Sequence, residues 1–276
     1  MKFTKILAEK TNINEILLPH SYQRIGDILL IKLKHDVLKR RFDIGSALLL
    51  MYPYIKTVCL IKGIQNEFRK PKIEVISGSE TKTVHKEHGI LYKLDVSKIM
   101  FSKGNLFERQ RLIKQIKPNE TIVDLFAGIG YFSLGLAKFS KAKIIYAIEK
   151  NPSAFKLLKE NIELNKIDNI KPIYGDCRQV ARQKKFQNIA DRIVMGYLPK
   201  TYKFLLSAFL FLKPEGIIHY HDTFVKDELW EKPVKILNGF VEKNSCKIKI
   251  LSKRVVKSYA PNVEHVVIDF QIKKYR

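Results

Sequence analysis

The chain has 276 residues, of which 46% are hydrophobic and 28% charged, with only 13 glycines and 10 prolines. This composition excludes a disordered chain and a collagen-like one, and the length predicts about two domains. The 51 lysines and arginines outnumber the 27 acidic residues, which gives a formal net charge of +24 and indicates a polyanionic partner, above all a nucleic acid.

Neither the cysteines nor the apolar runs suggest export or membrane insertion. No apolar run approaches the length of a membrane span, and the first residues lack the apolar core of a signal peptide. Cys59, Cys177 and Cys246 are odd in number and far apart, so they predict neither a disulfide framework nor a zinc cluster. We expect a cytoplasmic protein that needs no metal, no membrane and no obligate protein partner.

The first 98 residues predict a small α+β domain. Four β-like runs are separated by turns and charged clusters, and one stretch predicts a short helix. The predicted strands are 24–33, 57–62, 72–77 and 90–96, and the predicted helix is 44–55.

From about residue 99 the pattern alternates between strand and helix, which predicts a parallel sheet covered on both faces. Asn151 and Pro152 are typical of a helix start. The last two strand-like runs have no helix between them and predict a terminal antiparallel pair. The expected strands are 121–125, 143–149, 170–174, 191–196, 216–220, 247–256 and 263–272, with a helix over about 130–139.

The strongest local signal is the run Asp124-Leu-Phe-Ala-Gly128-Ile-Gly130, which follows a predicted strand and opens a predicted helix. Glycines there let the backbone approach a ligand closely, and a helix N-terminus favours an anionic group. The run lacks the third glycine of a dinucleotide-binding loop and the Gly-Lys-Ser/Thr of a triphosphate-binding loop. Asp124 is placed to receive an amine.

Two more acids follow the next two strands. Glu149 ends one strand, where a carboxylate suits the two hydroxyls of a ribose, and Asp176 follows the next, where it can accept a hydrogen bond from an adenine amine. Each acid alone is typical of a solvated turn or helix cap. Together, in this order, they favour a nucleoside ligand with an amine-bearing or positively charged tail.

This ordered set resembles the class I S-adenosylmethionine-dependent methyltransferase fold over residues 100–276. The resemblance implies an α/β, Rossmann-like catalytic domain over 99–276, preceded by an N-terminal α+β tRNA-binding domain over 1–98. It also implies that the glycine loop holds the methionine part of S-adenosylmethionine, Glu149 the ribose and Asp176 the adenine.

A closer resemblance comes from Phe101-Ser-Lys-Gly-Asn-Leu-Phe-Glu-Arg109 and from the stretch between Arg24 and Asp95. Both are similar to a tRNA-modifying branch that contains the tRNA guanine-37 N1-methyltransferases and the wybutosine-pathway aminocarboxypropyl transferases. The methyltransferases carry an Asn-Pro-Pro-Tyr or Asn-Leu-Pro type motif after the fourth strand, where this chain has Met195-Gly-Tyr-Leu-Pro199. That difference, with the segments 216–222 and 257–269, resembles the aminocarboxypropyl transferases.

The resemblance implies transfer of the 3-amino-3-carboxypropyl group from S-adenosylmethionine to a carbon of a tricyclic wyosine-type base at position 37 of tRNA-Phe, with release of methylthioadenosine. A guanine-37 N1-methyltransferase on the same scaffold is the first alternative. A non-catalytic tRNA-binding module with a degenerate donor site is the second.

The remaining candidates are side chains near these motifs. His219 and His221 share one face of a strand, and they could line a substrate crevice, hold the donor's carboxylate, act as a base, bind a metal or simply pack. Cys177 is expected to be a small buried group, and Phe126 to pack beneath the loop. The expected donor contacts are Ser102, Lys103, Arg109, Asp124, Phe126, Gly128, Gly130, Tyr131, Glu149, Lys150, Asp176, Cys177 and Met195, and the expected catalytic group is Lys103, Tyr197, His219 and His221.

Overall fold

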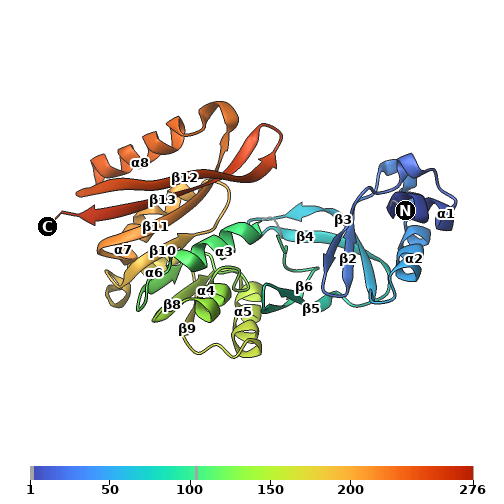
Figure 1. Cartoon of the computed structure of the whole chain (residues 1–276), viewed down its shortest axis with the longest axis horizontal. Helices are drawn as coiled ribbons and strands as arrows, with labels where there is room; N and C mark the ends of the chain where they lie inside the picture. Colours follow the sequence, from blue (N-terminus) through green and yellow to red (C-terminus); the bar gives the residue numbers. More distant parts are fainter. Residues whose placement is uncertain (1–2, 103–104, 276) are drawn as a thin grey trace. The chain divides into compact units, whose positions relative to one another are not determined.

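The structure is a computed structural model that describes residues 3–102 and 105–275. The chain divides into two compact units, of which the first ends at Ser102. This division lies a few residues beyond the boundary expected at residue 98. Figure 1 shows the helices and strands of both units along the chain.

The first unit is a small α+β fold. Its four-stranded sheet has the order β1-β2-β3-β4, and β5 and β6 form a separate antiparallel ladder. A core that includes Leu7, Leu29 and Leu48 joins two helices to the larger sheet. The elements are α1 (Phe3–Thr11), β1 (Gln23–Ile25), β2 (Ile28–Ile31), α2 (Arg41–Met51), β3 (Thr57–Gln65), β4 (Lys70–Ser77), β5 (Lys82–Glu87) and β6 (Ile90–Asp95), with 3-10 turns at Glu15–Leu17 and His35–Arg40.

The single strand expected over 24–33 is wrong, because Gly26 turns the chain back on itself. Its φ is +56°, a conformation that residues with a side chain adopt at a cost, so the apolar run becomes the antiparallel pair β1 and β2. A Cβ on Gly26 would lie 2.0 Å from Oγ1 of Thr83. That hydroxyl donates to Asp27 at 2.6 Å and thereby fixes the turn.

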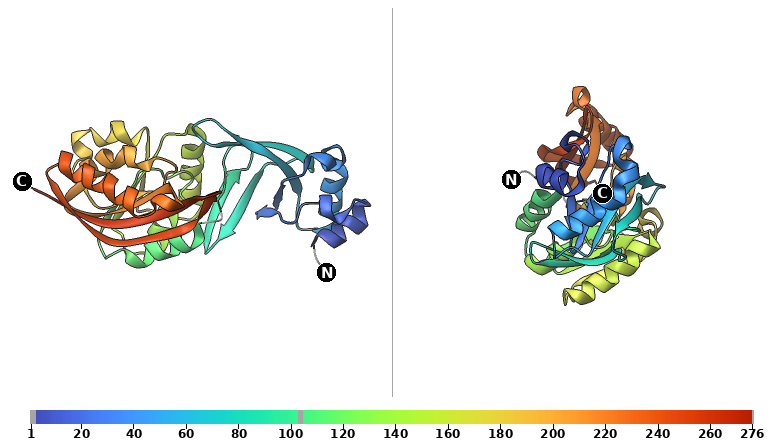
Figure 2. Two further views of the ribbon diagram at one scale, coloured as in Figure 1. Left: turned by 90° about the horizontal axis from the view of Figure 1, so that it is seen from above. Right: turned by 90° about the vertical axis from the view of Figure 1, so that its right-hand side faces the viewer.

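The second unit contains a seven-stranded sheet with the order β12-β13-β11-β10-β7-β8-β9. The five strands from β11 to β9 are parallel, as the alternating pattern predicted. β13 runs antiparallel to β11 and β12 antiparallel to β13, which confirms the expected terminal pair (Figure 2). The strands are β7 (Thr121–Asp124), β8 (Ile144–Glu149), β9 (Ile170–Tyr174), β10 (Ala190–Met195), β11 (Leu212–Val225), β12 (Cys246–Ala260) and β13 (Val263–Lys274).

Helices cover both faces of this sheet. One face packs against α6, α7 and α8 through a core that includes Val123, Ile193 and Phe270. On the other face, α4 and α5 both pack on β8 and β9, and α3 packs on α4. The helices are α3 (Leu106–Gln115), α4 (Ser133–Phe139), α5 (Pro152–Leu164), α6 (Cys177–Ala181), α7 (Leu205–Phe211) and α8 (Glu231–Lys243), with 3-10 turns η4 (Lys184–Phe186), η5 (Thr201–Phe204) and η6 (Lys226–Glu228).

A β-bulge at Leu251 changes which side chains of β12 face which side of the sheet. Before it, Ile250 pairs with Phe270, and after it, Ser252 pairs with Asp269. One extra residue shifts the alternation by one position, so Arg254 points to the same face as α3. None of the helices in the described part of the chain is long and apolar enough to cross a membrane.

Two glycines, Gly26 in a crowded turn and Gly239 in an open part of a helix, provide a test of this fold. Gly26→Ala should lower the free energy of unfolding by about 2 kcal/mol, because it imposes a positive φ and displaces Thr83. Gly239→Ala should raise it by up to ~1 kcal/mol, because Gly239 lies inside α8 with open space around it. Urea unfolding of both variants measures this difference, and equal effects would contradict the proposed turn.

Candidate active site

The three acids singled out in the sequence stand side by side at the carboxyl edge of the sheet. Asp124 ends β7, Glu149 ends β8 and Asp176 lies two residues past the end of β9. These three strands are neighbours in the sheet. In the sheet, β7 has β8 on one side and β10 on the other. The strand order therefore reverses at β7. In open α/β sheets, ligands bind in the crevice outside the carboxyl ends at such a switch point.

Glu149 is bound to the glycine loop. Its Oε2 accepts the backbone N–H of Gly128 at 2.7 Å, and its Oε1 accepts that of Asn151 at 2.6 Å. Burial raises the pKa of this carboxyl above its ordinary value, and the backbone hydrogen bonds oppose the rise. A backbone hydrogen bond from Lys150 also reaches this carboxylate, whose oxygens keep further acceptor capacity for a diol.

The Asp124 carboxylate holds the glycine loop through hydrogen bonds. It is completely buried, with one oxygen accepting the hydroxyl of Ser133 at 2.7 Å and the other the N–H of Phe126 at 3.2 Å. Burial raises its pKa to about 6. The structure therefore shows Asp124 holding the loop, and direct contact with a ligand's amine stays a prediction.

The two glycines of the loop are required by what lies against them. Their φ values are +58° at Gly128 and +100° at Gly130, and a Cβ at either position would come within 2.7 Å of Tyr131 or Leu134. The ring of Tyr131 thus covers the loop. The guanidinium of Arg109 lies over this ring at 5.2 Å from its centroid, so α3 reaches the loop from one side.

Asp176 caps α6 and is paired with cations. Its carboxylate accepts the backbone N–H of Arg178 and both arms of the Arg178 guanidinium, and Nζ of Lys150 lies 3.8 Å away. Arg178 is the main reason that its pKa is lowered. Burial raises the pKa of the neighbouring Cys177 thiol to about 12, so Cys177 is an inert buried group, as expected.

An aromatic cluster stands at the switch point between β7 and β10. The Phe126 and Tyr197 rings are stacked, with centroids 5.1 Å apart, and Phe204 packs edge-on against both. The Arg178 guanidinium lies 5.2 Å from the Phe204 centroid. Phe126 is partly buried against the core, as expected, and Tyr197 and Phe204 extend the cluster beyond the loop.

Asp222, which was outside the expected set, fixes the loop that follows β10. This buried carboxylate accepts the N–H groups of Lys200 at 2.8 Å and Tyr202 at 3.2 Å, and the hydroxyl of Tyr220 at 2.6 Å. The hydroxyl of Thr201 donates to the carbonyl of Tyr197. The position of Tyr197 is therefore set by a short hydrogen-bonded loop.

Met195 does not present its side chain to a ligand. It is fully buried in the core cluster, which corrects the expectation of a donor contact by that side chain. The reason is strand alternation: Ile193 and Met195 both face α7. At the next position, a Cβ on Gly196 would lie 2.8 Å from the ring of Phe132, so this position has no room for a side chain.

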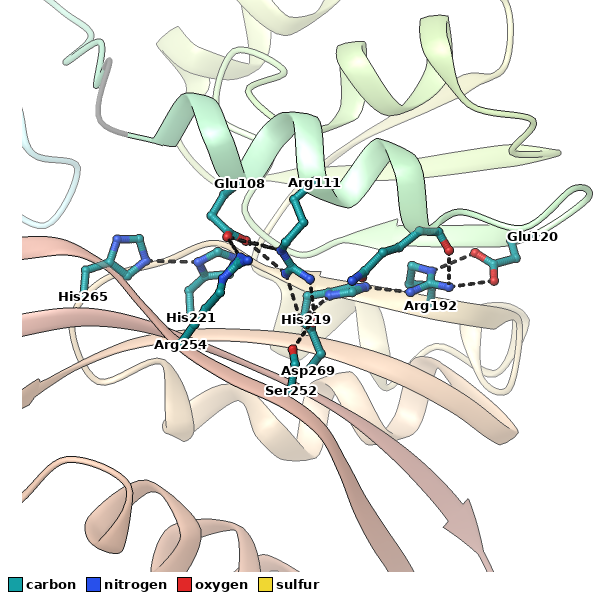
Figure 3. A network of polar contacts seen from close by, with 11 residues as sticks. Glu108, Arg111, Glu120, Arg192, His219, His221, Ser252, Arg254, His265 and Asp269 are labelled. Atoms are coloured by element: carbon teal, nitrogen blue, oxygen red, sulfur yellow. Dashed lines mark hydrogen bonds and ion pairs between the residues drawn. The ribbon is translucent and has the colours of Figure 1, made fainter.

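His219 is also in the interior. Its Nε2 lies 2.7 Å from the guanidinium of Arg192 and its Nδ1 lies 2.6 Å from Asp269 (Figure 3). An arginine only donates, so Nε2 must accept and Nδ1–H must donate to Asp269, which fixes one neutral tautomer. Burial lowers the pKa of His219, in agreement with the neutral form. Both nitrogens are used, which corrects the expectation that His219 lines a crevice or acts as a base.

The contacts of His219 belong to a buried network that attaches α3 to the sheet (Figure 3). Arg111 of α3 pairs with Asp269 of β13 and with Glu108 one turn earlier, and Glu108 also binds Arg254 of β12. At the other end, Arg192 forms a two-pronged pair with Glu120 at 2.7 and 2.8 Å. Buried charges persist only when they are paired, so this network fixes α3 against β10 to β13.

Comparisons with known proteins place both units of the chain in one family. Residues 83–250 match the family described as TRM5/TYW2 methyltransferase domain, and residues 3–81 match the one described as TYW2 N-terminal domain. The chain belongs to the TRM5/TYW2 family. It is a member across both units, since the two matches together span most of the sequence.

Individual relatives of this TRM5/TYW2 member come from both branches. It is 44% identical to the tRNA(Phe) (4-demethylwyosine(37)-C(7)) aminocarboxypropyltransferase of Methanocaldococcus jannaschii, over 92% of this chain and 98% of that protein. It is 35% identical to the tRNA (guanine(37)-N(1))-methyltransferase Trm5b of Pyrococcus abyssi, over 92% of this chain and 76% of that protein.

Two solved structures show the same fold. TYW2 of Pyrococcus horikoshii in complex with MeSAdo superposes with a TM-score of 0.87 at 38% identity, over 99% of this chain and 100% of that one. TYW2 of M. jannaschii in complex with AdoMet gives a TM-score of 0.75 at 40% identity, over 92% of this chain and 100% of that one. These matches confirm the Rossmann-like fold with an N-terminal domain.

Three further expected residues are His221, Ser102 and Lys103. His221 is buried, with Nδ1 3.0 Å from Nε2 of His265 and its ring beside Phe132, so it too packs in the interior rather than lining a crevice. Ser102 is half-buried, and Lys103 lies outside the described residues. Within the described ranges, no three His, Cys, Asp or Glu side chains are grouped as a metal site requires.

The residues that the sequence reasoning missed are mostly charged groups on buried strands. Asp269 and Arg192 each interrupt an apolar run, and a charge in such a run is the one signal that could have found them. Arg111 and Arg254 carry no such signal, because their partners lie far away in the sequence.

The buried histidine pair should make stability depend on pH. Burial lowers the pKa of His265 from 6.5 to about 4, so the unfolded chain takes up this proton first as the pH falls. His265 therefore contributes its full share of the unfolding free energy above pH 6.5. As the pH falls from 6.5 to about 4, that contribution decreases by up to ~1.4 kcal/mol per pH unit. In urea titrations at a series of pH values, we expect the unfolding free energy of His265→Gln to fall less steeply with decreasing pH, by that same amount per pH unit. His20→Gln, at an exposed position, is the control, and an unchanged slope in His265→Gln would contradict the assignment.

Proposed function

We propose that this chain transfers the 3-amino-3-carboxypropyl group of S-adenosylmethionine to carbon 7 of the 4-demethylwyosine base at position 37 of tRNA(Phe). The main support is the 44% identity to the M. jannaschii enzyme of that name over nearly the full length of both chains. The loop after β10 agrees, because Tyr197 precedes Leu198-Pro199 where the related methyltransferases carry an asparagine.

The residues at the carboxyl edge fit the donor. Glu149 would accept the two ribose hydroxyls, because its oxygens are already oriented by Gly128 and Asn151. Asp176 stays ionised beside Arg178 and would accept the adenine amine. The loop at Gly128 and Gly130 would receive the methionine part, whose sulfonium and ammonium charges match the negative charge of Asp124 and Glu149.

The reaction is a substitution at carbon. The base carbon forms a bond to the terminal CH2 of the donor's aminocarboxypropyl chain, and the bond from that CH2 to sulfur breaks with its electron pair left on sulfur. Methylthioadenosine leaves, and the base carbon releases its proton to solvent, which restores the aromatic ring. The sulfonium is already a good leaving group, so the protein's work is to align the chain with the departing sulfur.

The aromatic cluster is suited to hold the acceptor. Phe126 and Tyr197 form a stacked pair at the switch point, next to the donor residues, and a planar tricyclic base can continue such a stack. Tyr197 is fixed by the loop that Asp222 binds. We assign Tyr197 to acceptor positioning, and His219 and His221 to the folded core.

Two alternatives fit less well. A guanine-37 N1-methyltransferase is disfavoured by the lower identity to Trm5b, 35% against 44%, and by the missing asparagine. A non-catalytic RNA-binding module would have no reason to keep the loop, the three acids and their hydrogen bonds together. The net charge of +24 supports an RNA substrate, and the three buried free cysteines support a reducing cytoplasm as its location.

Mass spectrometry of the product tests this proposal. After incubation of the protein with S-adenosylmethionine and tRNA(Phe) carrying 4-demethylwyosine, we expect a gain of about 101 mass units with release of methylthioadenosine, since the CH2–sulfur bond of the chain is the one aligned for attack. The control is tRNA(Phe) with unmodified guanine-37, which should gain nothing. A gain of about 14 units on that control, with S-adenosylhomocysteine released, would identify a methyltransferase instead.

Donor affinity should weaken in mild acid. The pKa of Asp124 is about 6 because of burial, and its protonation removes a negative charge from the loop. We expect the Kd for S-adenosylmethionine, measured by calorimetry, to rise up to tenfold per pH unit below about 6, since each protonation step competes with the cationic ligand. Asp124→Asn should bind weakly at every pH and lose this dependence. Asp191→Asn, at the start of β10, should behave as the unaltered protein. A pH-independent Kd in the unaltered protein and in Asp191→Asn would refute the role of Asp124.

A further inference from the structure

One aromatic side chain of the second unit stands apart from the donor site. Phe107, in the first turn of α3, is 73% exposed, which makes it the most exposed aromatic side chain in the described ranges. The guanidinium of Arg254 lies over this ring, 5.1 Å from its centroid. One flank of the ring is thus backed by a cation while most of its surface is open to solvent.

The Arg254 guanidinium is held firmly in this position. It is paired with the carboxylate of Glu108, whose side chain is almost completely buried. Glu108 is itself held by Arg111 at 3.0 Å, and Arg111 by Asp269. A surface arginine would be mobile, whereas this one is attached to the buried network of Figure 3. Phe107 is therefore presented in a defined orientation, and little conformational entropy is lost when something binds to it.

The position of Phe107 is at the carboxyl edge of the sheet. Across the strands, Arg254 pairs with Val267 and Val267 with His221, which lies one residue past the level of the last residue of β10. The other end of α3 is at the amino edge, where the carbonyl of Gln115 accepts from Arg192. Phe107 thus lies at the same edge as Asp124 and Glu149 but on the flank of β12 and β13, away from the donor residues.

We propose that the Phe107 ring is a stacking platform for an unpaired base of the substrate RNA, next to the base that is modified. An exposed aromatic ring backed by arginine is the kind of surface on which single-stranded bases stack, and the charge of +24 draws RNA to the protein. Stacking tolerates any base, so this contact would orient the loop without reading its sequence. The inference rests on the proposed function, because it takes an anticodon loop as the ligand.

Direct binding tests the platform without depending on catalysis. The probe is an RNA hairpin with the anticodon stem-loop sequence of tRNA(Phe) and 2-aminopurine beside position 37, titrated with protein in the absence of donor. We expect Phe107→Ala to weaken binding about tenfold and to reduce the quenching of 2-aminopurine, since a base–aromatic stack contributes that much to affinity. Phe107→Trp should bind and quench as well as the unaltered protein.

Matched controls separate stacking from other causes. Phe139→Ala removes another exposed ring beside a cation, Lys138, at the C-terminal end of α4, and should change neither affinity nor quenching. The melting temperature of Phe107→Ala should stay unchanged, because the ring is on the surface. Phe107→Leu should behave like the alanine variant. Binding and quenching by Phe107→Ala equal to those of the unaltered protein, or full rescue by leucine, would overturn the platform.

Enzymatic assays then distinguish the two proposals. If both hold, Phe107→Ala raises the KM for tRNA about tenfold and leaves kcat at saturating tRNA unchanged, because the ring acts in binding. Loss of the proposed function would appear as no product from the unaltered protein, while hairpin binding still depended on Phe107. Loss of the platform alone would appear as normal kinetics in Phe107→Ala.

Discussion

The compensation of buried charge is the constraint on which the second unit depends. Arg111, Arg192 and Arg254 are matched by Glu108, Glu120 and Asp269, with His219 held neutral between Arg192 and Asp269. Removing one member would leave an uncompensated charge in the interior, so the whole set has to assemble together. Its members come from α3 and its neighbouring strands, and their pairing leaves a single way to dock the helix on the sheet.

That docking places both flanks of the first turn of α3. On one flank, Arg109 lies over Tyr131 and meets the glycine loop. On the other, the Arg254 guanidinium lies over the ring of Phe107, which is exposed to solvent. The same helix therefore touches the donor side and the proposed RNA side of the carboxyl edge. This buried network thus sets the geometry of the two proposed binding surfaces.

The donor side follows from local rules that the sequence displays. A short apolar strand, a loop with two glycines and an acid at the end of the next strand are close in sequence, and parallel pairing brings their ends together. For this reason Gly128, Gly130, Glu149 and Asp176 could all be placed from the sequence. The hairpin at Gly26 was missed, because one turn glycine inside an apolar run is a weak signal. Helices α1, α3 and α8 were also missed, although α8 is strongly amphipathic.

The sequence by itself determined the fold class, the strands of the second unit, the glycine loop and the acids that follow it. These depend on contacts within a few tens of residues and on the period of apolar positions. Only the tertiary structure decided what His219, Met195, Asp222 and Arg254 do. Strand alternation turns Met195 into the core, and the bulge at Leu251 turns Arg254 toward α3. Such outcomes depend on strand register and on tertiary partners, of which Glu108 lies 146 residues before Arg254, and no local pattern encodes them.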